Sequence, residues 1–342
     1  MRDLRMRWTR VLGCAAVAMV VGAAALPVAA GAAETAANDG VTIRAGTNAR
    51  KDPTVAVLEY LPAKVTVKVG TPVTWTWKGT IEPHSVTFPA PGQTLPPPGS
   101  DPALFGPTPP TGPYDGTSFV NSGLQPLGDA APEPFTMSFS KAGSYEYFCV
   151  IHPKMIGEVD VVDSGTTDSA QAVKARGTKQ AKKWVKEGIA AHEALVKRAN
   201  RSVKNADGTR TWAIQMGTTT EHTDVLAFAP TPKRIKAGDS IKFVNNSQAP
   251  HTGTFAGEQQ PITNPIGPQT DNPAPGPSPQ TLNSTDLFNT GLLPPKVATE
   301  PGGSPPPKAV RSYTYKVPKK GNYPYYCILH TLSGMGGTIR AR

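Results

Sequence analysis

The chain has 342 residues, and 35 lysines and arginines against 25 acidic residues give it a formal charge of +10 at pH 7. This balance suits an acidic partner protein or an anionic surface, and it suits a merely soluble basic protein equally well. The sequence lacks the interleaved arginine and aromatic residues of a nucleic-acid platform, so nucleic acid is not expected as a partner.

The N-terminus has the pattern of a secretory signal. Four arginines precede the apolar run 11–30, which ends in small residues before the chain turns polar. We therefore predict a signal peptide over 1–32, cleaved near Ala32, and a periplasmic, envelope-associated or extracellular protein. Its removal lowers the formal charge from +10 to +7. The run is also long enough for an uncleaved membrane anchor. Lipidation of Cys14 is less favoured, because Cys14 opens the apolar run.

The rest of the chain contains two copies of one pattern at a nearly constant offset. The stretch "YEYFCVIHPKM" from Tyr145 matches "YPYYCILHTLSGM" from Tyr323. Further matching pairs are Ile43/Ile214, Gly46/Gly217, Pro62/Pro230, Gly70/Gly238, Trp75/Phe243, His84/His251 and Leu124/Leu292. So many matches in one order indicate an internal duplication.

Each copy alternates apolar and polar residues in short runs between glycines and prolines, as in "VTVKV" and "VTWTW". This predicts an all-β fold with two tandem β-sandwich domains, 41–163 and 210–342. Each copy also carries a Pro/Gly-rich excursion, 89–117 or 257–281, which we expect to be a surface loop.

An amphipathic connector helix is predicted over 167–203. Although Gly177 should weaken the helix, one face at helical spacing carries Ala181, Trp184, Val185, Gly188, His192, Leu195, Val196 and Ala199. We expect its apolar face to pack on one or both sandwiches. A lysine-rich helix on a membrane surface is the alternative.

The two remaining cysteines could form a disulfide, as is usual in exported proteins. The repeat argues against this, because each cysteine has its own histidine and methionine partners. In the first copy these are Cys149, His152 and Met155, with the chain expected to turn between Pro153 and Gly157, and His84 supplies a second imidazole.

The second copy repeats the set with His251, Cys327, His330 and Met335. Two imidazoles, a thiolate and a weak axial thioether are the ligands of copper electron-transfer sites. Zinc is the competing metal for such a set. The soft methionine favours copper.

These motifs resemble the cupredoxin family of blue copper proteins. The spacing Cys149-x-x-His152-x-x-Met155 is similar to the amicyanin loop, and Cys327-x-x-His330-x₄-Met335 is similar to the longer plastocyanin and halocyanin type. The resemblance implies Greek-key sandwiches with one mononuclear copper at an end of each. It implies as metal ligands His84, Cys149, His152, Met155, His251, Cys327, His330 and Met335.

Two positions depart from the family pattern. The residue after the first ligand histidine is often asparagine, which ties the ligand loops together, and here it is Ser85 or Thr252. The residue after the cysteine is Val150 or Ile328. Because hydrogen bonds and apolar neighbours around a metal tune its redox potential, these two departures mean that the potentials of the two sites do not follow from the family pattern.

The resemblance implies an exported carrier of single electrons, with redox partners docking near His152 and His330, and it implies no catalytic residues. Copper buffering or delivery is the alternative. A copper reductase or oxidase, such as nitrite reductase, is less favoured, because only His192 and His222 are left for a catalytic copper. We expect His192 to pack on the helix stripe and His222 to lie on the surface. Electron exchange between the sites would require the two copper ends to pack against each other.

Overall fold

The computed structural model describes residues 40–97, 100–126, 131–258, 277–296 and 310–342. The expected signal peptide, 1–32, lies outside these residues. Asn38–Arg342 form one compact unit, to which all that follows refers. No helix within the described ranges is long and apolar enough to span a membrane.

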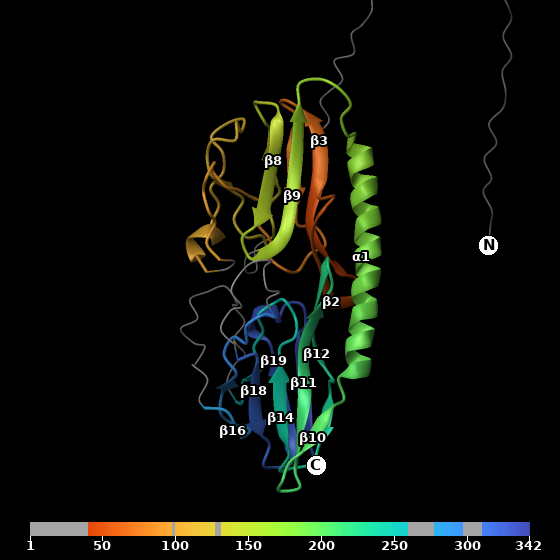
Figure 1. Ribbon diagram of the computed structural model, residues 1–342, viewed down its shortest axis with the longest axis vertical. Coiled ribbons are helices and arrows are strands. Elements are labelled where there is room, and N and C mark those ends of the chain that lie inside the picture. Colours follow the sequence, from red (N-terminus) through yellow and green to blue (C-terminus); the bar gives the residue numbers. More distant parts are fainter. Residues whose placement is uncertain (1–39, 98–99, 127–130, 259–276, 297–309) are drawn as a thin grey trace, which may run out of the picture. The chain divides into compact units, whose positions relative to one another are not determined.

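The first half of this unit, called here the N-terminal sandwich, consists of strands and one short 3-10 helix (Figure 1). Its elements are β1 (Val41–Ala49), β2 (Asp52–Leu61), β3 (Lys64–Lys68), β4 (Val73–Thr76), β5 (Thr87–Phe88), η1 (Pro102–Phe105), β6 (Val120–Asn121), β7 (Phe135–Met137), β8 (Gly143–Cys149) and β9 (His152–Val162).

After helix α1 (Ala170–Arg198) comes the C-terminal sandwich, which is built in the same way. Its elements are β10 (Ser202–Lys204), β11 (Arg210–Thr219), β12 (Thr223–Ala229), β13 (Lys233–Ile235), β14 (Ser240–Val244), β15 (Thr254–Phe255), β16 (Gln280–Thr281), β17 (Phe288–Asn289), β18 (Ser312–Lys316), β19 (Gly321–Tyr326), η3 (Ile328–His330) and β20 (Gly336–Ala341).

The all-β fold class is confirmed, and each sandwich pairs two sheets. In the N-terminal sandwich the order β2-β1-β4-β7 faces β3-β9-β8-β5-β6, and the C-terminal sandwich repeats both orders with β12-β11-β14-β18 and β13-β20-β19-β15-β17. Large aromatic side chains fill the space between the sheets. They include Trp75, Tyr147 and Phe88 in one core and Phe243, Tyr315 and Tyr325 in the other.

The two sandwiches share a sheet, which the sequence did not predict. Strand β2 pairs antiparallel with β12, so that the described strands of one sheet from each sandwich form a ten-stranded sheet. The pairing joins Val55 to Val225, Ala56 to Asp224 and Val57 to Thr223. The sandwiches are therefore joined by backbone hydrogen bonds as well as by the helix.

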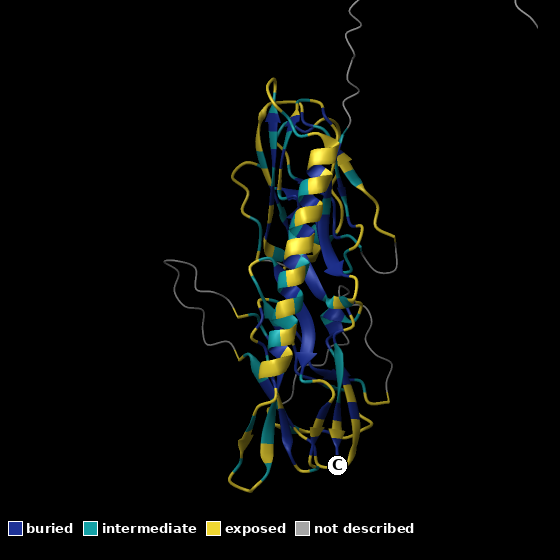
Figure 2. Ribbon diagram, turned by 90° about the vertical axis from the view of Figure 1, so that its right-hand side faces the viewer, coloured by how far each residue is buried: buried dark blue, intermediate teal, exposed yellow. Residues whose placement is uncertain are grey.

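Helix α1 lies along this shared sheet, with its exposed residues on the outer side (Figure 2). Ser169 caps its N-terminus by accepting a hydrogen bond from the amide of Ala172. The helix does not break at Gly177, because the glycine packs directly against the backbone of Leu61 and is buried. Val196 is 51% exposed and so lies outside the apolar face.

The first Pro/Gly-rich excursion is only partly a surface loop. Tyr114 within it is buried, and its backbone pairs with that of Phe139. Leu95, Pro96 and Leu104 line a cavity of about 150 Å³ whose other wall includes Phe148 and Cys149. The excursion therefore covers one side of Cys149. Most of the corresponding loop in the second copy lies outside the described residues.

Candidate metal centre

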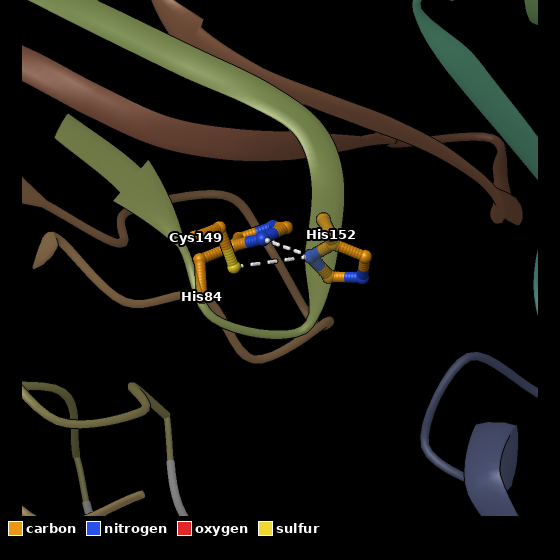
Figure 3. Close-up of side chains that lie close together, drawn as sticks. All are labelled: His84, Cys149 and His152. Carbon is orange, nitrogen blue, oxygen red and sulfur yellow. Dashed lines mark hydrogen bonds between the residues drawn. The ribbon is translucent and has the colours of Figure 1, made fainter. Parts of the chain in front are cut away.

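In the N-terminal sandwich the structure brings together three of the predicted ligands. Figure 3 shows His84, Cys149 and His152 turned toward one another. The two Nδ1 atoms of His84 and His152 lie 3.0 Å apart, and the sulfur of Cys149 lies 3.4 Å from His152 Nδ1. The thiol and both imidazoles can therefore contact a single ion.

The C-terminal sandwich repeats this arrangement. His251 Nδ1 lies 3.2 Å from His330 Nδ1, and the sulfur of Cys327 lies 3.8 Å and 3.4 Å from these two atoms. Nitrogen and sulfur ligands that bind one metal ion at roughly 2.0–2.3 Å lie about 3 to 4 Å from each other. Both sets fit such an ion. Cys149 and Cys327 are free thiols, so the disulfide alternative is wrong.

The strand order brings each histidine to its cysteine. Cys149 ends β8 and pairs with His152, the first residue of β9, so the chain reverses at Val150 and Ile151. The expected turn between Pro153 and Gly157 is therefore wrong. Both residues belong to β9, and Gly157 is needed there because a Cβ atom would overlap the ring of Tyr147.

The two methionines are buried beside these sites. Met155 is 1% exposed and belongs to the same core cluster as Cys149, while Met335 is 1% exposed and belongs to the cluster of Cys327. The carbonyl of Met335 also accepts a hydrogen bond from the amide of Cys327. Their role as axial ligands stays a prediction.

The first ligand histidine of each site has a hydroxyl partner on the nitrogen that faces away from the sulfur. His84 Nε2 lies 3.2 Å from the hydroxyl of Thr80, and His251 Nε2 lies 2.9 Å from that of Ser247. Such partners fix the tautomer and the ring orientation of a metal-binding histidine. The Nδ1 atoms are thereby left for a metal.

Ser85 takes over the bridging role of the family's asparagine. Its amide points at the sulfur of Cys149 from 3.5 Å, and its hydroxyl accepts a hydrogen bond from the amide of Val150 at 3.0 Å. Thr252 makes the same two contacts with Cys327 and Ile328 at 3.4 and 2.9 Å. The two ligand loops are thus tied together in both copies despite the departure from the family pattern.

Burial keeps all these ligands neutral. It lowers the pKa of His152 to about 4 and that of His330 to about 3, and it lowers the pKa of His84 and His251 as well. Burial raises the pKa of the Cys327 thiol to about 11 and also raises that of Cys149. A metal therefore meets imidazoles ready to bind and a thiol that must lose a proton.

The two remaining histidines pair with carboxylates at sites away from the cysteines. His192 Nδ1 lies 2.6 Å from Asp52, in agreement with a packed role on the helix. His222 was expected on the surface, but it is half-buried, stacks on Trp184 and lies 2.9 Å from Glu59. It contacts the other sandwich and belongs to the junction.

Sequence reasoning missed Glu82, which lies two residues before His84 and is 5% exposed. Its carboxylate accepts a hydrogen bond from Ser333 of the C-terminal sandwich and lies 3.9 Å from His330 Nε2. Burial raises the pKa of Glu82 to about 7. The sequence feature that could have drawn attention to Glu82 is a difference between the copies, because the second copy has Ala249 at the equivalent position.

Residues 48–162 match the family model of copper binding proteins of the plastocyanin/azurin family. The N-terminal sandwich is a cupredoxin domain. The plastocyanin of Scenedesmus fuscus is 29% identical over 114 residues, which cover 33% of this chain and 85% of that protein. The plastocyanin of Vicia faba is 25% identical over 33% of this chain and 86% of its own length.

Solved structures of amicyanin mutants also align with part of this chain. One, in its reduced Cu(I) form at pH 4, is 22% identical, covers 36% of this chain and 82% of its own, and has a TM-score of 0.22. Another, in the oxidised state, is 23% identical over 37% of this chain and 87% of its own, with a TM-score of 0.24.

Proposed function

We propose that the chain is an exported carrier of single electrons with two mononuclear copper sites. The observation that carries this proposal is the duplicated set of two Nδ1 atoms and one thiol sulfur, all within 4.8 Å of one another and almost fully enclosed. The ligands would be His84, Cys149, His152 and Met155 in one site and His251, Cys327, His330 and Met335 in the other. Copper bound there supplies a one-electron couple.

The protein's own groups hold this site in one geometry. His84, Cys149, His251 and Cys327 are buried, and the amides of Ser85 and Thr252 approach the sulfurs. A donor set that does not rearrange suits a metal that changes oxidation state, because little has to move when an electron arrives. Enclosure also keeps water from the metal position.

Electron exchange with a redox partner is proposed on the surface beside His152, which is less buried than His330, the equivalent ligand of the second site. Pro153 and Lys154 next to it are exposed, and Ile156 is 42% exposed. A small apolar patch with a lysine fits a weakly bound, acidic redox partner, whose interface would be about 1,200 Å² or less. His330 is 8% exposed, so a partner would reach the second site through neighbours such as Leu332, which is 58% exposed.

The proposal is tested by titrating the mature chain with Cu(II) while the thiolate charge-transfer band is recorded. We expect two equivalents of copper, an intense blue band and reversible reduction. Cys149→Ala and Cys327→Ala should each lose one equivalent and part of the band.

A colourless protein that holds copper only as Cu(I) would instead indicate buffering or delivery. Zinc bound in preference to copper would support the zinc alternative. Turnover of nitrite, or of phenols with oxygen, would support an enzyme.

A further inference from the structure

The seam between the sandwiches has the symmetry of a two-fold axis. The sequence repeat has an offset of 168 residues, as between Pro62 and Pro230, so Ala56 and Asp224 occupy equivalent positions. These two residues are paired at the centre of the β2–β12 contact. An antiparallel pairing of equivalent residues relates its two partners by a local two-fold rotation.

This symmetry brings the ligand-bearing ends of the two sandwiches together. Strand β8 ends at Cys149, and its arrowhead points toward the C-terminal sandwich in Figure 1, while Cys327 directly follows β19. The loop that ends at His84 contacts the loop between His330 and Met335, because Glu82 accepts a hydrogen bond from Ser333. The arrangement that the sequence left open is therefore end to end.

One side chain connects the two sites directly. Glu82 belongs to the loop that ends at His84, and its carboxylate contacts Ser333 and lies 3.9 Å from His330 Nε2. Glu82, Ser333 and His330 are all less than 10% exposed. His330 turns its other nitrogen, Nδ1, to the sulfur of Cys327.

The equivalent position of the second copy offers no such connection. Ala249 replaces Glu82 in the second copy, so the N-terminal site receives no corresponding carboxylate from its neighbour at this position. A carboxylate close to the outer nitrogen of a metal-binding imidazole adds negative charge beside the metal position. Negative charge there stabilises the higher oxidation state of a metal in the C-terminal site.

We propose that the two sites exchange electrons within the chain and that Glu82 is the positioning residue that links them and sets the direction. This inference rests on the proposed function. One electron passes from the C-terminal to the N-terminal site, so that Cu(I) in the former becomes Cu(II) and Cu(II) in the latter becomes Cu(I). No bond forms or breaks, and no proton is transferred.

The first test measures the midpoint potential of each site in the full chain. The C-terminal site is isolated by Cys149→Ala and the N-terminal site by Cys327→Ala. Glu82→Gln should raise the potential of the C-terminal site and shift that of the N-terminal site less. The matched control is Glu59→Gln, which removes another inter-sandwich carboxylate, on His222, without touching a predicted ligand.

The second test follows the blue absorption after rapid reduction of fewer than half the sites. A first-order phase whose rate is independent of protein concentration is expected, and Glu82→Gln should slow it while Glu59→Gln does not. A rate proportional to protein concentration would overturn intramolecular exchange. An unchanged C-terminal potential in Glu82→Gln would overturn the role of Glu82.

Two further measurements keep the outcome decisive. If Glu82→Gln fails to fold, Ser333→Ala removes the contact between Glu82 and Ser333 without changing the charge, and it should shift the midpoint potential of the C-terminal site.

With both sites as Cu(II), the electron spins should show dipolar coupling that disappears in Cys149→Ala. Absence of this coupling from the intact chain would contradict the end-to-end arrangement. A chain that binds no copper contradicts the proposed function itself, whereas two blue sites that do not exchange electrons contradict only this inference.

Discussion

The first ligand histidine of each site lies directly behind a glycine of strand β1 or β11. Gly46 has φ +76°, and a Cβ atom there would overlap His84 Nε2 and lie 2.8 Å from its Cδ2 atom. At Gly217, with φ +74°, a Cβ atom would lie 3.0 Å from His251 Nε2. These glycines leave the room in which each imidazole keeps its ring orientation.

Gly46→Ala should therefore displace His84 and abolish the N-terminal site, so that bound copper falls from two equivalents to one. Gly70→Ala is the matched control, since its φ of +81° imposes similar backbone strain while nothing lies within 4 Å of the new methyl group. The measurement is copper stoichiometry together with the blue band. Two equivalents in Gly46→Ala would show that His84 tolerates the displacement.

The ligand types could be predicted from the sequence, but their surroundings could not. Cys149 and His152 lie three residues apart, and local spacing with a repeat was enough to identify them. Glu82 contacts residues about 250 positions away, and such a contact follows only from how the sandwiches pack. The replacement of Glu82 by Ala249 in the second copy marks the position, but it does not reveal which residues Glu82 contacts.

At the scale of elements, helix α1 and strands β2 and β12 form one packed layer. Gly188 of the helix approaches the strands so closely that a Cβ atom would lie 2.5 Å from Val55 and 2.5 Å from Thr223. The periodicity of the sequence predicted the helix. Its close approach to the strands depends on single glycines, which lower helix propensity and therefore count against a helix in the sequence. The run Val225–Ala229 is apolar without alternation, which is typical of a strand covered on both faces.

Gly188→Ala should destabilise the protein by about 1 to 3 kcal/mol, because overpacking against two buried β-branched side chains exceeds the gain of roughly 1 kcal/mol in helix propensity. Thr178→Ala on the exposed face of the same helix is the control and should be neutral or slightly stabilising. Denaturant unfolding of both variants measures the free energy of unfolding. A stabilised Gly188→Ala would show that the helix can move outward at little cost.

At the scale of the whole chain, a buried acid lies at the centre of the β2–β12 pairing. Asp224 is 4% exposed, one of its carboxyl oxygens has no hydrogen-bond partner, and burial raises its pKa to about 6. The equivalent residue in the other sandwich is Ala56. The seam therefore carries a single charge at its centre, where a symmetric pair would place two.

Because the folded state binds the Asp224 proton more tightly than the unfolded chain does, the free energy of unfolding falls as the pH rises from about 4 through 6. Asp224→Asn should remove this penalty and stabilise the protein by about 2 to 3 kcal/mol at pH 8. Most of the gain should be absent at pH 4. Unfolding by denaturant at pH 4 and pH 8 measures the change in the free energy of unfolding. The control is Asp163→Asn, which replaces an exposed acid. An equal gain in the free energy of unfolding at pH 4 and at pH 8 would contradict the titration of Asp224 between these pH values.

The shared sheet makes the distance between the two candidate sites independent of the protein concentration. Two separate single-sandwich carriers meet at a rate that falls with dilution. Here the β2–β12 pairing and the 29-residue helix α1 hold the partners at a fixed, high effective concentration. In this chain the second candidate site therefore stays beside the first at any protein concentration.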